Sequence, residues 1–182
     1  MKEVAVRLAT EKDVEAVVAL WRELMAVHQE LAPLVWTLSQ DAEERYRDHL
    51  ADMMQDANHQ VYVAADRDEV VGYLVVEKAA RPPVLTPATR GVFGEICVAP
   101  PARRAGVGRR LVAEAMRWFR EEGLAMAEVG YATDNPMSAP FWEGLGFRPY
   151  RITAVCSLRQ DQGPAQRSTR RVGELKESLG SW

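Results

Sequence analysis

The chain has 182 residues, enough for one domain with a full hydrophobic core that needs neither disulfides nor a metal ion. Its composition, 47% apolar and 27% charged, is typical of a globular protein. The 23 basic and 26 acidic residues leave a net charge of −3, which argues against nucleic acid as a partner. Any affinity for an anion must therefore be local.

Targeting signals and metal motifs are not evident in the sequence. Residues 1–10 contain no apolar stretch of signal-peptide length, and no run approaches a membrane span, so we expect a cytoplasmic protein without a membrane partner. The two cysteines, Cys97 and Cys156, stand in apolar runs without the spacing of a zinc motif. We expect reduced thiols and no metal site.

The first half of the chain alternates between strand-like and helix-like patterns. Thr10 is followed three residues later by Asp13, the spacing of a capping box that opens a helix. Pro33 breaks the helical period, and Trp36 beyond it either fills the core, the commoner role of an aromatic residue, or walls a substrate pocket. The patterns predict a strand over 4–8, a helix over 14–25, a loop over 29–40, a second helix from Asp41, and a β-hairpin over 61–76 with its turn at 66–69.

The second half contains a strand and a helix joined by a glycine-rich turn, followed by weaker signals. Gly123 and Gly146 each end a helical pattern. The patterns predict a polar loop over 81–90, a strand over 94–98, a helix from Gly108, a strand over 126–132, a short helix over 135–145 and a final strand over 147–158. From Gln160 the chain is polar and mildly basic, with a helical pattern over 174–179. We expect one domain over 1–158 and a partly flexible or helical appendage over 159–182.

Residues 103–108, with the sequence Arg-Arg-Ala-Gly-Val-Gly, form the glycine-rich turn. Such a turn before a helix directs free backbone N–H groups at one point, which is how proteins bind phosphate. A P-loop is excluded because Arg109 and Arg110 stand where it needs Lys and then Ser or Thr. A dinucleotide fingerprint lacks its third glycine at Leu111, although Glu128 lies near the offset of a ribose-binding acid. That interpretation and a purely structural glycine turn stay open.

A longer pattern surrounds this turn. Arg103-x-x-Gly106-x-Gly108, preceded by a strand and followed by a helix, resembles the acetyl-coenzyme A motif of the GNAT superfamily of N-acetyltransferases. Residues 61–74 are similar to the family's central hairpin, and residues 135–147 resemble its later motif, which ends in Gly-Phe. The resemblance covers about residues 4–158. It implies an α/β (α+β) fold of one domain, with a central mixed and mostly antiparallel sheet splayed at the cofactor site and helices on both faces.

The resemblance implies acetyl-coenzyme A as the co-substrate. Backbone N–H groups of residues 104–108 would hold its pyrophosphate, because glycine allows close approach, and guanidinium groups would pair with its phosphates. Its pantetheine arm would lie as an added strand along residues 96–98, with its thiol end beside the later motif. The residues expected to bind the cofactor are Ile96, Cys97, Val98, Arg103, Arg104, Ala105, Gly106, Val107, Gly108, Arg109, Asn135, Ala139, Phe141 and Trp142.

Acetyl transfer to an amine needs a base, because an alkylamine with a pKa of about 10.4 is mostly protonated at neutral pH. Glu95, on the strand that leads into the turn, is the candidate base, the alternative being an ordinary strand-end carboxylate. The resemblance implies a strand bulge near Val98 whose N–H stabilises the oxyanion. Where the family commonly has a tyrosine to protonate the leaving thiolate, this chain has Trp142, which releases no proton. Tyr131, Tyr150 or water is expected to act instead.

We therefore expect direct transfer of an acetyl group from acetyl-coenzyme A to a primary amine in a ternary complex. A covalent route through Cys97 lacks a predicted base. The acceptor, a small molecule or a peptide, would bind at residues 29–55 and 81–90. Acidic residues in the first segment either favour a cationic acceptor, such as a polyamine or an aminoglycoside, or only face solvent: Glu30, Asp41, Glu43 and Glu44. The alternative function is a non-catalytic acyl-coenzyme A-binding or sensing module, and the resemblance also implies a homodimer.

Overall fold

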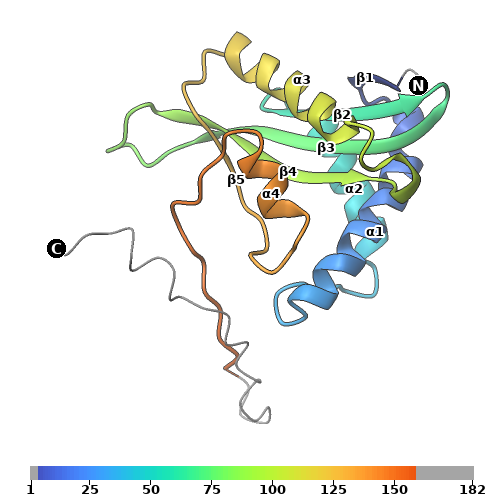
Figure 1. Ribbon diagram of the computed structural model, residues 1–182, viewed down its shortest axis with the longest axis horizontal. Coiled ribbons are helices and arrows are strands. Elements are labelled where there is room, and N and C mark those ends of the chain that lie inside the picture. The colour runs from blue at the N-terminus through green and yellow to red at the C-terminus, as the bar shows by residue number, and fades with distance from the viewer. Residues whose placement is uncertain (1–3, 159–182) are drawn as a thin grey trace. The chain divides into compact units, whose positions relative to one another are not determined.

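The computed structural model describes residues 4–158, and its centre is one β-sheet (Figure 1). Five strands follow one another in chain order across the sheet: β1 (Val4–Leu8), β2 (His59–Asp66), β3 (Glu69–Ala80), β4 (Thr89–Val98) and β5 (Ala127–Val129). Strands β1 to β4 pair antiparallel, and β5 pairs parallel with β4. The sheet is therefore mixed and mostly antiparallel, as predicted for an α+β fold.

Helices cover both faces of this sheet, which confirms the predicted layers (Figure 1). One face carries a core that includes Val17 and Leu50 of the first two helices, and the other carries a core that includes Leu111 and Phe119 of the third. Leu111 and Phe119 are buried because they recur at helical spacing on one side of that helix. The helices are α1 (Val14–Leu31), α2 (Ala42–Gln55), α3 (Val107–Glu121) and α4 (Ser138–Glu143), with short 3-10 turns at Glu11–Asp13 and Pro100–Ala102.

The start of α1 contains the predicted capping box. The Asp13 carboxylate accepts the Thr10 N–H at 2.7 Å and the Thr10 hydroxyl at 2.8 Å. Arg7 of β1 donates to both oxygens of the same carboxylate, at 2.7 and 2.8 Å. These hydrogen bonds, with that from Arg7 foremost, hold the pKa of Asp13 well below its usual range. The same residue therefore joins α1 to the first strand.

The pairing of β3 with β4 shifts by one residue at Gly94. Phe93 is opposite Val76 and Glu95 is opposite Val75, so Gly94 is the extra residue of a β-bulge. Because of the bulge, residues 93 and 95 face opposite sides of the sheet although they are two apart. Phe93 packs in the core under α3, whereas Cys97, two residues beyond Glu95, packs in the core under α1 and α2. The bulge was expected near Val98, and that expectation was wrong.

The sheet separates beyond the bulge, as the fold prediction required. β5 pairs with β4 only from Gly91↔Ala127 to Phe93↔Val129. β4 continues to Val98, so its last residues have no partner strand on that side within residues 4–158. The space between the separating strands contains the site described below.

Several predicted boundaries differ from the structure; α1, for example, continues to Leu31, although a loop was predicted from residue 29. β4 begins at Thr89, so the connection from β3 is shorter than predicted, and Arg81 N–H closes it by donating to the Ala88 carbonyl at 2.8 Å. β5 has only three residues, where a strand over 126–132 was predicted. The strand predicted over 147–158 is not formed, because these residues pair with no other strand of the described chain. Ile152 there is 77% exposed.

The contacts between residues divide the chain into two units; the first ends at Arg151, and the second begins at Ile152. The predicted domain boundary after residue 158 stays a prediction, and the helix predicted over 174–179 lies outside the described residues. Within residues 4–158, no helix is both long enough and apolar enough to cross a membrane. In the same range, His, Cys, Asp and Glu side chains nowhere gather in a group of three or more that could hold a metal ion.

Candidate active site

A cavity of about 610 Å³ lies where β4 and β5 separate. Its walls come from the end of β4, the glycine-rich turn, the start of α3, the second half of α1 and the segment from β5 to α4. Five of its lining residues are charged: Glu23, Glu95, Arg103, Arg104 and Arg109. The arginines belong to the turn and to α3, whereas the two glutamates belong to α1 and β4, so the two signs of charge come from different walls.

The glycine-rich turn places the start of α3 against this cavity. Gly106 is the residue before the helix and has a φ of 79°, in the left-handed region that favours glycine. The first N–H groups of an α-helix have no partner within the helix, and here they belong to Val107, Gly108 and Arg109, which all line the cavity. Gly108 lets this helix end lie close to α4, since an added Cβ would be 3.3 Å from the Phe141 ring. The turn thus presents unpaired donors to the cavity.

The arginines of the turn differ in what they contact. Arg103 Nε donates to the Val98 carbonyl at 2.9 Å, and Arg109 donates to the Gly144 carbonyl at 3.2 Å. Arg110 donates to the Val4 carbonyl of β1 at 3.0 Å and does not line the cavity. The Arg104 side chain, which does line it, makes no hydrogen bond or ion pair with any residue between 4 and 158. Arg104 is therefore the guanidinium that is free to meet an anion.

The last residues of β4 offer backbone groups to the cavity. Ala99 donates its N–H to the Val71 carbonyl of β3 at 2.9 Å. Because the direction of backbone groups alternates along an antiparallel strand, the N–H and C=O groups of Ile96 and Val98 point away from β3. The bond from Arg103 to the Val98 carbonyl agrees with this direction. The strand edge that would pair with an added strand thus lies open beside the cavity.

The structure brings together most of the residues predicted to bind the cofactor. All of them line the cavity except Ala105 of the turn and Ala139 of α4. Asn135 is buried, and its side-chain oxygen accepts the Met137 N–H at 3.0 Å, which turns the chain toward α4. Trp142 is only 3% exposed and packs among aromatic rings, so it is both core and cavity wall.

Glu95 lies in the cavity wall with one carboxylate oxygen already bonded. Its Oε2 accepts the Tyr46 hydroxyl at 2.6 Å and the Tyr73 hydroxyl at 3.0 Å. Burial raises the pKa of Glu95, and the two hydrogen bonds and the nearby His49 oppose that rise. The pKa is raised overall. Sequence reasoning missed both tyrosines, because α2 and β3 bring them to Glu95 only by tertiary packing.

The two predicted proton donors are placed differently. Tyr131 lines the cavity. Tyr150 does not line it; this side chain is 73% exposed and donates to Glu128 at 2.8 Å. Tyr131 is thus the hydroxyl that the structure brings to the site.

The α1 wall of the cavity contains residues that sequence reasoning also missed. Glu23 and His28 line it, whereas residues 29–55 and 81–90 do not contribute to its lining. The His28 ring stacks on Trp36 with 4.5 Å between ring centroids, and its Nδ1 is buried without a hydrogen bond to the described residues. Burial lowers the pKa of His28 and so favours the neutral ring. No sequence signal distinguishes this wall, because Glu23 and His28 are five residues apart, which is not the spacing of one helix face.

The acidic residues expected at the acceptor site do not line the cavity. Asp41 pairs with Arg45 at 2.6 Å, and Glu43 pairs with Arg22 at 3.4 Å. Glu23 is the acidic residue that α1 presents to the cavity. It has no hydrogen bond or ion pair with residues of the described part of the chain.

Cys97 is an unsuitable nucleophile in this setting. Burial, with the charge of Glu23 adding to it, raises the pKa of the Cys97 thiol to about 11. The thiolate, which is the nucleophilic form, is therefore scarce at neutral pH. Among residues 4–158, no hydrogen bond joins this thiol to a histidine. This geometry gives no support to a covalent route through Cys97.

Comparison with known families assigns this chain to the acetyltransferases. The model of the Acetyltransferase (GNAT) family matches residues 6–147, and the chain belongs to this family. The family assignment that the sequence suggested is thus confirmed. No curated protein matches the chain at a significant level.

Solved structures of acetyltransferases share the fold. A GCN5-related N-acetyltransferase from Ralstonia eutropha JMP134 matches 85% of this chain and 99% of its own, with a TM-score of 0.66 and 21% identity. The aminoglycoside 6'-N-acetyltransferase AAC(6')-Ig from Acinetobacter haemolyticus matches 86% of this chain and 99% of its own, with a TM-score of 0.67 and 18% identity. The aminoglycoside N-acetyltransferase AAC(6')-Iy, solved with coenzyme A, matches 85% of this chain and 99% of its own, with a TM-score of 0.66 and 15% identity. At these identities, the likeness concerns the fold.

Proposed function

We propose that this acetyltransferase transfers an acetyl group from acetyl-coenzyme A directly to a primary amine. One observation carries the proposal: a single cavity joins the unpaired donors at the start of α3 to a half-buried carboxylate on β4. The first end suits an anionic donor molecule, and the second suits a base. Family membership supports acetyl transfer in general, and the coenzyme A complex of a protein with the same fold supports this donor.

The residues of the turn fit the phosphates of coenzyme A. The N–H groups of Val107, Gly108 and Arg109 and the free Arg104 guanidinium would hold the pyrophosphate. The open edge of β4 at Ile96 and Val98 would pair with the pantetheine arm, as a strand pairs with an edge. Bound in this way, coenzyme A supplies a thioester as the acetyl donor.

The chain's own groups then account for the transfer of protons. Glu95 takes a proton from the acceptor ammonium, and the neutral amine attacks the thioester carbonyl. The Val98 N–H, which points away from β3, would stabilise the resulting oxyanion. The carbon–sulfur bond breaks, the thiolate takes a proton from Tyr131 or from water, and the nitrogen gives its extra proton back to the same group. The products are an amide and coenzyme A.

We infer a cationic acceptor of small size. Glu23 of α1 and Glu95 of β4 both line the cavity, and Glu23 has no cation partner within residues 4–158. An acceptor with a second ammonium group, such as a polyamine or an aminoglycoside, would pair with Glu23. A peptide amine is the other acceptor class to be compared.

A non-catalytic acyl-coenzyme A sensor is the second candidate function. It is favoured by Trp142, which occupies the position of a proton donor and is packed in the core. The position of Tyr150 also favours a sensor, because this predicted proton donor does not line the cavity. A sensor would bind acetyl-coenzyme A and release no thiol in the presence of any amine.

We also infer a homodimer, as the family resemblance implied. Apolar side chains at the end of the described chain are exposed, including Val155 at 62% and Leu158 at 90%. Exposed apolar side chains that gather into one patch mark contacts between proteins. Sedimentation velocity would show a single species with twice the chain mass of 20.4 kDa, whereas a species of the chain mass would contradict the dimer.

The test is a panel of amines mixed with the protein and acetyl-coenzyme A, with released thiol and the mass of the product as readouts. The panel contains polyamines, aminoglycosides and lysine peptides, and each is matched by its permethylated form, which keeps the charge but has no N–H to acetylate. We expect thiol release with at least one polycationic amine and none with its permethylated form. Binding of acetyl-coenzyme A by calorimetry without thiol release from any amine would support the sensor.

A further inference from the structure

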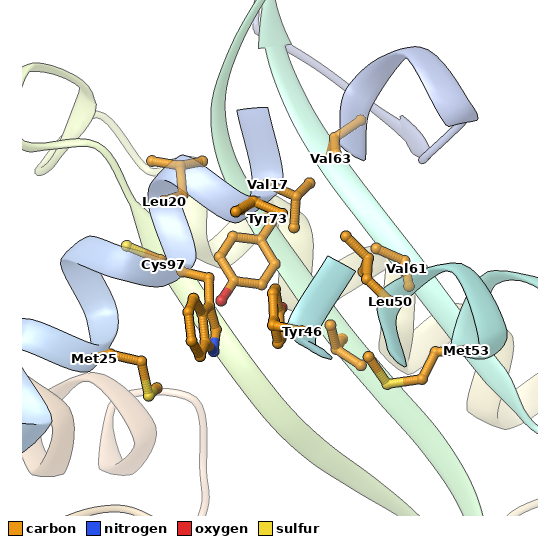
Figure 2. Close-up of a cluster of buried hydrophobic side chains, with 13 residues drawn as sticks. Val17, Leu20, Met25, Tyr46, Leu50, Met53, Val61, Val63, Tyr73 and Cys97 are labelled. Carbon is orange, nitrogen blue, oxygen red and sulfur yellow. The ribbon is translucent and has the colours of Figure 1, made fainter. Parts of the chain in front are cut away.

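Hydroxyl groups from two elements converge on one oxygen of Glu95. The Tyr46 hydroxyl from α2 lies 2.6 Å from Oε2, and the Tyr73 hydroxyl from β3 lies 3.0 Å from the same atom. Figure 2 shows Tyr46 and Tyr73 in the buried cluster under α1 and α2, with Cys97 of β4 nearby. Each hydroxyl has a single proton to donate, and the carboxylate accepts both.

Both hydroxyls are held firmly in place. Tyr46 is 6% exposed, and its ring stacks on Trp21 with 4.2 Å between centroids and 10° between planes. Tyr73 is fully buried in the middle of β3, where its backbone is paired with Cys97. Burial raises the pKa of both tyrosines well above the ordinary value, so both are protonated donors at neutral pH.

The other carboxylate oxygen has no such partners. Glu95 Oε1 makes no hydrogen bond with residues of the described chain, and Glu95 lines the cavity. We infer that Tyr46 and Tyr73 are positioning residues that hold Glu95 by Oε2 and leave Oε1 as the atom that receives the proton of the acceptor. This inference rests on the proposed function, because it assigns the geometry of the base in that reaction.

The same contacts set the pH range in which Glu95 acts as a base. The groups that face it are Tyr46 and His49 from α2, Tyr73 from β3 and Cys97 from its own strand, with Glu23 and His28 of α1 in the same cavity wall. Burial raises the pKa of Glu95, and the tyrosine hydroxyls lower it because they donate to the ionised form. Removing one hydroxyl must therefore raise this pKa further. A base acts only when ionised, so the rise of activity with pH must move to higher pH.

The variants Tyr46→Phe and Tyr73→Phe test this inference, because each removes one hydroxyl and keeps the buried ring. Tyr62→Phe is the matched control, since Tyr62 is a buried tyrosine of β2 in the opposite core and contacts no part of Glu95. We expect kcat/KM on the acidic side of the pH profile to fall about tenfold or more in the first two variants, the size of one lost hydrogen bond to a charged group. On the alkaline plateau, the loss is expected to be much smaller. The control is expected to follow the wild type at every pH.

A second readout does not depend on catalysis. The carboxyl carbon of Glu95, assigned in ¹³C-labelled protein by comparison with Glu95→Gln, is titrated by NMR without substrates. Its titration is expected to move to higher pH in Tyr46→Phe and Tyr73→Phe and to stay unchanged in Tyr62→Phe. An unchanged titration in both tyrosine variants, or an equal shift in the control, would overturn the inference. If the titration moves but no amine is acetylated by the wild type, the proposed function fails and the hydrogen-bond assignment stands.

Discussion

Gly106 and Gly108 are glycines for different physical reasons. Gly106 has a left-handed backbone, and an added Cβ there would meet no other atom within 4 Å. Gly108 has an ordinary helical backbone, but its Cβ would press on Phe141 at 3.3 Å. A side chain at position 106 would therefore enter the space where we place the pyrophosphate, whereas one at position 108 would separate α3 from α4.

Gly106→Asp is expected to weaken acetyl-coenzyme A binding by at least about tenfold, because it adds a negative charge beside the phosphates. Asp tolerates the left-handed region better than most residues, which limits the cost in stability. The matched control is Gly123→Asp, at the far end of α3, where φ is 69° and the Cβ also meets nothing within 4 Å. Isothermal titration calorimetry measures the affinity of each variant for acetyl-coenzyme A. Equal weakening in both variants would mean that the turn does not bind the phosphates.

The sequence could predict that a residue belongs to the candidate site only where a local motif contains that residue. Glu95 and the turn residues could be found because they follow one another along a strand, a turn and a helix start. Tyr46 and Tyr73 could not, since they lie 49 and 22 residues from Glu95 in sequence and meet it only when α2 packs on the sheet. Glu23 was missed for the same reason: nothing in the sequence shows which side of α1 faces the cavity.

At the scale of elements, Asp13 illustrates how one side chain fixes a helix start. Asp13→Asn keeps the shape of the side chain but loses the ion pair with Arg7. At neutral pH we expect this change to lower the free energy of unfolding by about 1 kcal/mol. The loss is no larger because Arg7 is partly exposed, and water weakens the ion pair. The pKa of Asp13 is depressed by folding, so its contribution is fully present above the unfolded value of about 3.9 and is lost as pH falls below it. The difference between the two proteins must therefore shrink in acid.

Urea unfolding of the wild type and of Asp13→Asn, at neutral pH and at low pH, measures how the difference in free energy of unfolding depends on pH. Asp41→Asn is the control, because Asp41 precedes α2 in the same way but is exposed and makes no capping bond to the helix. Its effect is expected to be smaller than that of Asp13→Asn. A difference between Asp13→Asn and wild type that stays constant with pH would show that the ionised carboxylate does not stabilise α1.

Element types were predictable along most of the chain, and the errors have physical causes. The alternation over residues 4–8 and the helical spacing along α1 and α3 are local signals, and the structure has a strand and two helices there. The bulge at Gly94 depends on the pairing of β4 with β3, which no local pattern reveals. Residues 147–158 have the composition of a strand, but a strand also needs a partner, and none pairs with them in the described chain.

At the scale of the whole molecule, the net charge of −3 conceals a cavity lined by both signs of charge. The arginines come from the turn and the start of α3, whereas Glu23 comes from α1 and Glu95 from β4. An anionic donor and a cationic acceptor each meet an opposite charge in such a cavity. Binding of a polycationic amine is therefore expected to weaken as salt is added.

The central claim, that Glu95 is the base for amine acetylation, is tested most directly by comparing Glu95→Gln with the wild type on an accepted amine. Gln keeps the size of the side chain but cannot take the proton. We predict that kcat/KM falls by about 10²- to 10⁴-fold while the affinity for acetyl-coenzyme A, measured by calorimetry, is unchanged. Equal kcat/KM values in the two proteins, with the variant folded and binding the cofactor, would contradict the account.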